Sequence, residues 1–502
     1  MSSRSSPSRQ AAPVTVQLDL DHPTGNFWID NGLVALCNWI GAGNYPVEQL
    51  IASLQKHLLQ KTGNKGEYWD EATGTIREYE KVSWVYPTNL FIRISGTAPK
   101  RKIGDKGYPI RPPSFELNLQ LTKKQDYCDI CGSVGPTADA KMWIFPFVVD
   151  PGKFGNFYSG AKRGVKLCPR CSVAGVAGYL GWLWVGLGRD AFHFFLFHTD
   201  LHDLARFHRE VLQPLQVGTG RGGNVSPAFY GPYLHETTLG LLLDLFSHVR
   251  SSDRLTDAGR QFLASLLGAR ANSAPAPLTL YAITGKPGQA FNMQSFSEFS
   301  QFHSLYRFYE GSIESLGGDN PHRHFVDVFR QFQARDENQY NTIWRDRIAR
   351  SVLEFSDPLP FVEGFLFEVR VKEDNPLPLV WGTEHVIGRY TEEVLSMDEE
   401  MLKVLSGFGY RLGSAAYEKD EMGIIYSLRN AKNPEDFFRV LNDIQFRLDM
   451  TIPEQILRIE PGERIANNPW VRVKTLLAIY AMNSYLRAGK STHVNERGGN
   501  KE

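Results

Sequence analysis

The chain has 502 residues, of which 42% are hydrophobic, 12% aromatic and 22% charged, which favours about two to four folded domains with apolar cores. Its 55 basic and 55 acidic residues cancel, which excludes a uniformly basic nucleic-acid-binding protein but leaves room for local basic patches. Five cysteines are too few for a disulfide scaffold in a chain of this length.

The N-terminal part begins with a polar tail. Residues 1–16 contain no apolar run, so we expect a disordered tail rather than a signal peptide, and a cytoplasmic protein with reduced thiols. Helical periodicity follows over residues 29–40, and a second helix is predicted over residues 44–63, ended by its last residue, a glycine. Residues 81–96 and 114–122 alternate like β-strands.

Four of the five cysteines form two Cys-x-x-Cys pairs within a module of about residues 126–174. Such pairs are typical knuckles of a structural zinc site, because four thiolates leave the Zn²⁺ ion no open coordination position. The 36 residues between the knuckles favour an insertion over a small finger. A redox role is the weaker alternative, since no thioredoxin-like strand–helix context is evident. The predicted metal ligands are Cys128, Cys131, Cys168 and Cys171.

The uncharged run of residues 171–188 is too short to span a membrane and is predicted to be a buried core helix. Four histidines follow within residues 193–208. The His202–Asp203 pair could belong to a metal-dependent phosphohydrolase, but that site would need further ligands that cannot be assigned. Packing of these histidines among aromatic residues is the favoured interpretation.

Basic residues are unevenly distributed. Residues 81–124 hold nine Lys or Arg and two acidic residues, which favours contact with nucleic acid over a merely solvated loop. The cations beside the second knuckle could either neutralise the thiolates or face phosphate. Glycine-rich loops at residues 218–224 and 284–289 could approach nucleic acid closely. The predicted contacts are Lys100, Arg101, Lys102, Lys106, Lys162, Arg163, Lys166, Arg170, Arg221, Asn224, Lys286 and Gln289.

The second half of the chain is predicted to be mostly helical, over residues 234–267, 300–355 and from 391 onward. Residues 357–381 contain several prolines and are predicted to be a strand or linker. Asn433–Pro434 and Asn468–Pro469 each have the form of a helix N-cap followed by proline. The predicted fold class is α+β. It comprises a large mixed domain over residues 17–385 with the zinc insertion, a C-terminal helical bundle over residues 386–490, and a tail over residues 491–502.

One further stretch connects these features to a family. The segment HPTGNFWIDNGLVAL resembles the N-terminal TGNPFVD motif of the CRISPR-associated CXXC–CXXC proteins, which also carry paired cysteine knuckles. The motif corresponds here to residues 24–32, and it departs from the family by reading NFWID in place of NPFVD. The order of the two motifs and the chain length agree with that family as well.

The resemblance implies the large subunit of a type I-B Cascade, a crRNA-guided complex, and a protein that is not an enzyme. Such a subunit recognises the protospacer-adjacent motif in duplex DNA, supports R-loop formation and helps to recruit a helicase–nuclease. The implied partners are crRNA, target double-stranded DNA, and the backbone, 5′-handle-binding and small subunits, with no membrane. Asn26 of the motif joins the predicted nucleic-acid contacts, and the C-terminal helices resemble the small subunit.

Two other functions remain as alternatives. One is a metal-dependent nuclease that would use the His-rich segment of residues 193–208. The other is a zinc-stabilised scaffold that binds only proteins.

Overall fold

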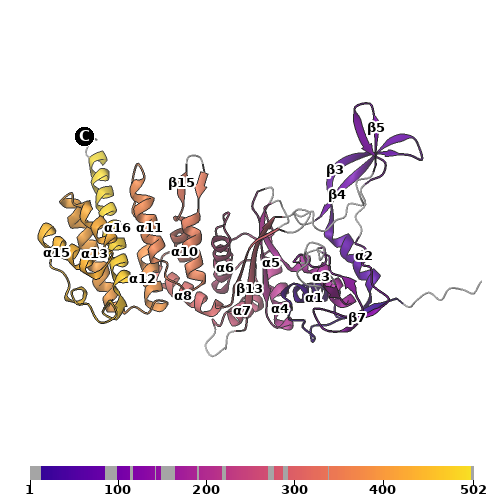
Figure 1. Ribbon diagram of the computed structural model, residues 1–502, viewed down its shortest axis with the longest axis horizontal. Helices are drawn as coiled ribbons and strands as arrows, with labels where there is room; N and C mark the ends of the chain where they lie inside the picture. Colours follow the sequence, from indigo (N-terminus) through magenta and orange to yellow (C-terminus); the bar gives the residue numbers. More distant parts are fainter. Residues whose placement is uncertain are drawn as a thin grey trace, which may run out of the picture. The chain divides into compact units, whose positions relative to one another are not determined.

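The computed structural model divides the chain into two compact units, which are described separately (Figure 1). Unit 1 comprises Met1–Ser226 and Ser251–Ser300, and unit 2 comprises Pro227–Arg250 and Gln301–Glu502. Helices and strands are mixed and the C-terminal part is helical, which confirms the α+β class. The structure describes residues 13–84, 99–112, 117–141, 143–147, 164–188, 191–217, 222–269, 276–286, 292–336 and 339–498.

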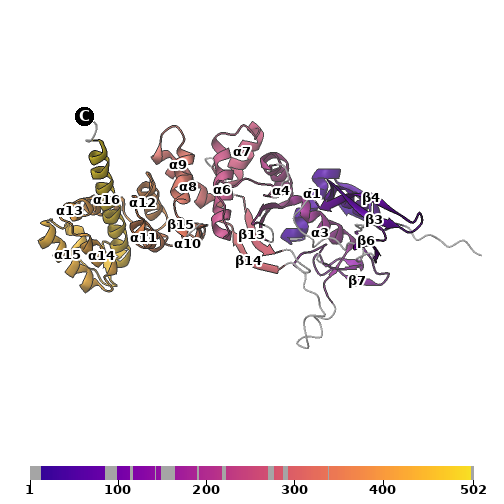
Figure 2. The same ribbon diagram turned by 90° about the horizontal axis from the view of Figure 1, so that it is seen from above.

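The centre of unit 1 is a four-stranded antiparallel sheet whose strands follow one another in chain order, as the pairing of β13 with β14 illustrates in Figure 2. Phe192, Phe194 and Ile283 lie in the same apolar core as Trp28 and Trp182. Large aromatic side chains suit such a core because each of them removes much apolar surface from water. The strands are β11 (Leu183–Gly186), β12 (Phe192–His198), β13 (Thr279–Lys286) and β14 (Asn292–Phe299).

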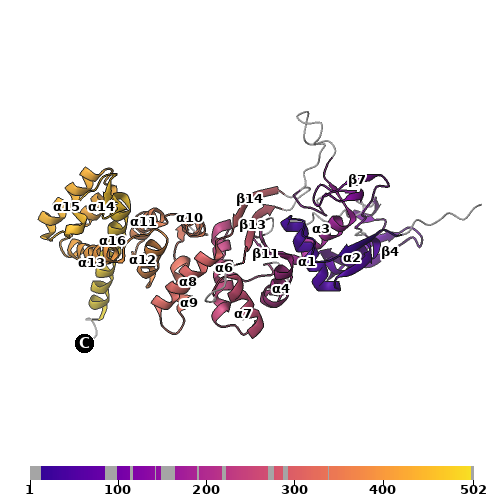
Figure 3. The ribbon, with the colours of Figure 1, turned by 90° about the horizontal axis from the view of Figure 1, so that it is seen from below.

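Two helices of unit 1, α1 (Phe27–Ile40) and α3 (Pro169–Gly181), pack closely against each other, as their adjacent positions in Figure 3 illustrate. Glycines make this contact possible. A Cβ on Gly32 would overlap the backbone of Ala174, and a Cβ on Gly178 would overlap the Trp28 ring. The Trp28 indole donates hydrogen bonds to the carbonyls of Gly175 at 2.8 Å and Ile144 at 3.2 Å.

The first turn of α1 is built around the buried carboxylate of Asp30. It accepts hydrogen bonds from the Thr24 backbone N–H at 2.8 Å, the Thr24 hydroxyl at 2.7 Å and the Gly25 N–H at 3.0 Å. His198 at the end of β12 lies 3.1 Å away. Burial opposes ionisation, but the hydrogen bonds from His198 and Thr24 outweigh it and hold the pKa of Asp30 below its ordinary value.

The predicted second helix begins near its expected start but ends early. It is α2 (Val47–Leu58), and the chain continues directly into β3 (Leu59–Asp70), which pairs with β4 (Thr75–Trp84). The prediction of a helix to residue 63 was therefore wrong, because β3 begins at residue 59 and residues 59–61 pair with β4 instead of extending the apolar face of α2. The short hairpin β5 (Lys100–Ile103) and β6 (Lys106–Pro109) lies against β3, as Figure 1 shows.

The apolar run of residues 171–188 is not one helix. It comprises most of α3 and then, after a break at Trp182, the strand β11.

Residues 117–122 form no strand, because their backbone pairs with other groups: the Leu117 N–H donates to the Gln55 side chain. None of the helices in the described part of the chain combines the length and the apolar character that a membrane crossing requires. At the N-terminus, β1 (Thr15–Leu18) pairs with β2 (Gly43–Pro46), so a strand begins within the predicted tail of residues 1–16.

Unit 1 contains further helices beside its sheet and strands. A continuous helical stretch over residues 201–215 includes α4 (Leu201–Phe207) and α5 (Gln213–Leu215), joined by a π-helical turn (His208–Leu212). A further helix is α7 (Asp257–Leu266), capped by the Thr256 hydroxyl. Between α5 and α7 the chain leaves unit 1 to form α6 (Leu234–Arg250) of unit 2.

Unit 2 is almost entirely helical in its described part. The region of residues 357–381, predicted to be a strand or linker, contains a helix whose prolines stand in its first turn, where proline is tolerated. The Asn433 side chain caps its helix as predicted, by accepting from the Asp436 N–H at 2.8 Å. Asn468 does not act as a cap, because it lies in a short strand and its amide donates to Ala466. The helices are α6 (Leu234–Arg250), α8 (Phe302–Leu316), α9 (Pro321–Arg330), α10 (Ile343–Leu353), α11 (Leu359–Glu368), α12 (Thr383–Glu393), α13 (Glu399–Glu418), α14 (Met422–Asn430), α15 (Pro434–Leu448) and α16 (Trp470–Gly498).

The long last helix, α16, packs along α13 and also against α11. The Asn483 side chain of α16 accepts a hydrogen bond from the Leu379 N–H at 2.6 Å. These contacts join residues on both sides of position 385. The chain passes between the two units after residues 226, 250 and 300, so position 385 lies within unit 2.

We expect Asp30→Ala to lower the free energy of unfolding by about 3 kcal/mol at neutral pH, because the partly buried groups that donate to this carboxylate lose their acceptor. A lowered folded-state pKa means that the carboxylate stabilises the fold above the ordinary pKa of about 4 and ceases to do so as pH falls through the folded-state value. Urea unfolding at several pH values measures this. The exposed Asp21, which pairs with the exposed His202, provides the control Asp21→Ala. Equal stability of both variants would contradict the role of Asp30.

We expect Gly32→Ala to destabilise unit 1 by at least about 2 kcal/mol, because the added methyl group must separate α1 from α3. The matched control is Gly407→Ala on an exposed face of α13, where a Cβ meets no atom within 4 Å. Alanine there should be neutral or stabilising by up to about 1 kcal/mol. Thermal unfolding compares the two variants, and an unperturbed Gly32→Ala protein would contradict the close helix contact.

Candidate functional site

The first knuckle is the turn between β7 (Gln125–Tyr127) and β8 (Val134–Pro136). The Cys128 N–H donates to the Ser133 carbonyl at 2.8 Å, and the Gly132 N–H donates back to the Cys128 carbonyl at 2.9 Å. Gly132 has a φ of 73°, a backbone conformation that glycine adopts without strain. This tight turn brings Cys128 and Cys131 to the same side of the hairpin.

The second knuckle is the first turn of α3. Cys168 is its N-cap residue, and its sulfur accepts from the Cys171 N–H at 3.4 Å. Pro169 occupies the first helical position, where its missing N–H costs no hydrogen bond. The N-terminus of a helix favours negative charge, so this turn stabilises thiolate sulfur.

The four cysteine sulfurs come together as predicted, all within 4.8 Å of one another, with the Cys131 and Cys168 sulfurs 3.7 Å apart. A tetrahedral zinc ion with bonds of about 2.3 Å separates its ligand sulfurs by about 3.8 Å. The sulfurs are too far apart for a disulfide. Four close thiols therefore form a set of ligands that could bind a metal ion such as zinc. Cys37, the fifth cysteine, is free and lies outside the cluster.

The thiols of the cluster interact strongly with one another. Hydrogen bonds from Cys168 and Cys171 lower the pKa of Cys128. Donating to Cys128 raises the pKa of Cys168 to about 11 and raises that of Cys171 further. Several of the thiols must lose protons to become metal ligands, so metal binding releases protons and weakens as pH falls.

Two cations beside the second knuckle already have partners within the protein. The Lys166 ammonium pairs with Asp139. The Arg170 guanidinium donates to the His22 carbonyl at 2.8 Å and lies 3.7 Å from the Asp19 carboxylate. These contacts attach the N-terminal segment and the inserted strands to the second knuckle, and they do not support the predicted phosphate-facing role of Lys166 and Arg170.

The β5–β6 hairpin carries four cations that were predicted to contact nucleic acid, and only two of them interact with other described side chains. The Arg101 guanidinium lies 4.8 Å from the centre of the Trp69 ring, and the Lys106 ammonium pairs with Glu67. Lys100 and Lys102 alternate with Arg101 along β5, so they point to the opposite face. Both are exposed, and neither has an ion-pair partner among the described residues.

The remaining residues that were predicted to contact nucleic acid differ in their surroundings. Asn26 caps α1 by accepting from the Trp28 and Ile29 N–H groups, each at 3.1 Å. Asn224 is buried, accepts from the Trp184 N–H at 2.7 Å and donates to the Trp182 carbonyl at 3.0 Å, so it has no surface for a ligand. Lys286 is exposed at the end of β13, where its role stays a prediction. Lys162, Arg163, Arg221 and Gln289 lie outside the described residues.

The histidines predicted to be packed in the core have separate partners. His193 is buried against the Thr284 hydroxyl at 2.7 Å, and His208 lies 3.0 Å from the Asn31 amide oxygen. Burial lowers the pKa of His208 to about 4. His198 pairs with Asp30, and the exposed His202 pairs with Asp21. Within the described part of the chain, only the cysteine cluster brings three or more candidate metal ligands together.

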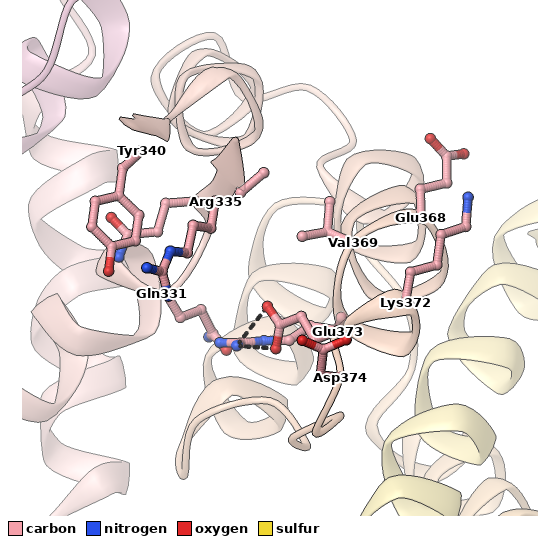
Figure 4. Close-up of a pocket in the computed structure, with 11 residues that line it drawn as sticks. Gln331, Arg335, Tyr340, Glu368, Val369, Lys372, Glu373 and Asp374 are labelled. Carbon is pink, nitrogen blue, oxygen red and sulfur yellow. Dashed lines mark hydrogen bonds and ion pairs between the residues drawn. The ribbon is translucent and has the colours of Figure 1, made fainter. Parts of the chain in front are cut away.

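Unit 2 contains a cavity that sequence reasoning missed. It has a volume of about 820 Å³ and lies between a short hairpin, β15 (Ala334–Asp336) with β16 (Gln339–Asn341), and the end of α11 (Figure 4). Its polar lining comes from segments about thirty residues apart, and no spacing rule connects them. The lining residues include Gln333, Arg335, Tyr340, Glu368, Arg370, Lys372, Glu373 and Asp374.

Comparisons of the chain with family models, curated proteins and solved structures gave no match.

We expect the purified chain to retain about one metal ion, and Cys128→Ser to lose it, because the buried serine cannot replace a thiolate ligand. Elemental analysis identifies and counts the ion. Acidification should release it from the wild-type chain as the ligand sulfurs regain protons. Cys37→Ser is the matched control and should keep its metal. A folded wild-type chain without metal at neutral pH would contradict the site.

Proposed function

We propose that the metal is a structural Zn²⁺ ion and that this chain is the large subunit of a type I-B crRNA-guided interference complex. Four thiolates would complete a tetrahedral zinc ion and leave no position for substrate or water. The ion would then hold the first knuckle and the inserted segment against α3, without taking part in a reaction.

The observation that carries the proposal is the meeting of the two motifs in one core. The TGNFWIDNG segment forms the start of α1, the second knuckle forms the start of α3, and these two helices pack directly on each other. Two motifs that lie more than a hundred residues apart in the sequence therefore come together on two helices that pack against each other. This supports the resemblance to the CXXC–CXXC large subunits, in which both motifs occur together.

In such a complex the guide RNA would supply sequence specificity, and this chain would contact the duplex beside the target and the backbone of the nucleic acid. Such contacts need exposed cations, which Lys100 and Lys102 provide. The proposal includes recognition of the adjacent motif, support of the R-loop, recruitment of the helicase–nuclease, and a cytoplasmic location. The helical C-terminal part is consistent with a region similar to the small subunit.

Co-expression with the crRNA and the other subunits tests the assignment. We expect the chain to co-purify in an RNA-containing complex that binds duplex DNA only with the correct flanking motif. A chain that stays outside the complex, or a complex that binds equally well without it, would overturn the proposal. Metal-dependent cleavage by the isolated chain that is lost in His202→Ala would instead favour the nuclease alternative.

We expect the double variant Lys100→Glu and Lys102→Glu to weaken duplex binding by the complex at least about tenfold near 100 mM salt. Two lost phosphate contacts should reduce the slope of log affinity against log salt by about 2. Electrophoretic mobility shifts over a range of salt concentrations measure both quantities.

The charge-matched control is Lys403→Glu with Lys432→Glu, which alters two exposed lysines of unit 2. It should leave the affinity and the salt slope unchanged. If the two double variants behave alike, the β5–β6 hairpin does not contact DNA.

A further inference from the structure

The cavity of unit 2 has the size of a ligand site. Its volume of about 820 Å³ falls within the range of about 300–1,000 Å³ that is usual for such sites. Figure 4 shows Arg335 and Tyr340 on one side of the cavity and Glu368 and Lys372 on the other, with Glu373 and Asp374 below. Side chains from two separate segments of the chain therefore line the same cavity.

Most of the acidic groups at the cavity are already engaged. Glu373 accepts from the Arg370 guanidinium at 3.2 Å, and Glu368 pairs with Arg429 at 2.6 Å. Arg335 and Lys372 are exposed, and within the described ranges neither has an ion-pair partner. Two cations are therefore left to attract an anion, and an arginine fork suits phosphate oxygens in particular.

An aromatic ring stands beside these cations. Tyr340 is 65% exposed, and Figure 4 shows it next to Arg335. A flat exposed ring is a stacking surface for a nucleobase of any sequence. The Gln333 amide and the Asp374 carboxylate add hydrogen-bonding groups that suit the polar edge of a base. The cavity therefore offers a ring that suits the face of a base, polar groups that suit its edge and cations that suit the phosphate.

We propose that this cavity binds a nucleotide unit of single-stranded nucleic acid, with the base stacked on Tyr340 and phosphate held by Arg335 and Lys372. A free nucleotide has the same chemistry. The choice of a strand rests on the proposed function, since an opened duplex would supply single-stranded DNA to this chain.

The test uses the full-length chain carrying Lys100→Glu and Lys102→Glu, so that the β5–β6 hairpin does not obscure binding at the cavity. Fluorescence anisotropy measures its affinity for a labelled single strand of about 12 nucleotides. Tyr340→Ala should weaken binding about tenfold and leave the salt slope unchanged, because stacking releases no counterions. Arg335→Gln with Lys372→Gln should weaken binding and lower the slope by about 1.4.

Two variants serve as controls. Tyr340→Phe keeps the ring and should bind like the parent. Phe446→Ala removes another exposed ring of unit 2, one that is 80% exposed on α15 and does not line the cavity, and should also bind like the parent. Circular dichroism verifies that each variant is folded.

Unchanged strand affinity in both Tyr340→Ala and the Arg335 and Lys372 double variant would overturn the proposal. Competition by AMP at the same concentration as the strand would assign the cavity to a free nucleotide, which would overturn the choice of a strand. Failure here is distinguishable from failure of the proposed function. A cavity that binds nothing leaves crRNA-dependent co-purification intact, whereas a chain that never joins the complex can still bind a strand at Tyr340.

Discussion

The contact between α1 and α3 is the constraint on which the organisation of unit 1 depends. Helices approach this closely only where side chains are absent, and Gly32 and Gly178 provide that absence, while Gly175 allows Ile144 of the inserted segment to approach α3. The Trp28 indole then reaches carbonyl groups of α3 and of the inserted segment. Because the second knuckle is the first turn of α3, the same contact determines where the metal ligands lie relative to the sheet. A change in this packing would therefore disturb the core and the cysteine cluster together.

The polar residues of the TGN segment serve this contact. Asn26 caps α1, while Asp30 gathers donors from Thr24, Gly25 and His198. A buried carboxylate is stable only when such donors compensate for its lost hydration. The segment thus positions the start of α1 against the end of β12. Its asparagine was expected to contact nucleic acid, but the structure gives it a backbone partner, and the same holds for Asn224.

Pairing separates the cations of unit 1 into two groups. Lys106, Lys166 and Arg170 hold carboxylates or carbonyl oxygens of the protein itself. Lys100 and Lys102 are exposed on one face of a hairpin and carry no such partner in the described ranges. A cation that already has a close partner gains little from a phosphate, whereas an unpaired exposed one can release counterions on binding. The same reasoning distinguishes Arg335 and Lys372 from Arg370 in unit 2.

The sequence by itself was sufficient to predict the α+β class, the four cysteines that come together and could bind a metal ion, and the burial of His193 and His208, because short-range spacing and composition carry those features. The expected packing of His202 was wrong, since its side chain is exposed. The sequence-based predictions of secondary structure were wrong where contacts with distant segments of the chain determine the local structure. The run of residues 171–188 is divided between a helix and a strand because β12 supplies a partner for its second half, and residues 359–368 are helical because α16 packs on them. Only the tertiary structure decided which cations are paired and which groups line the cavity of unit 2, because side-chain neighbours from separate segments cannot be inferred from local sequence.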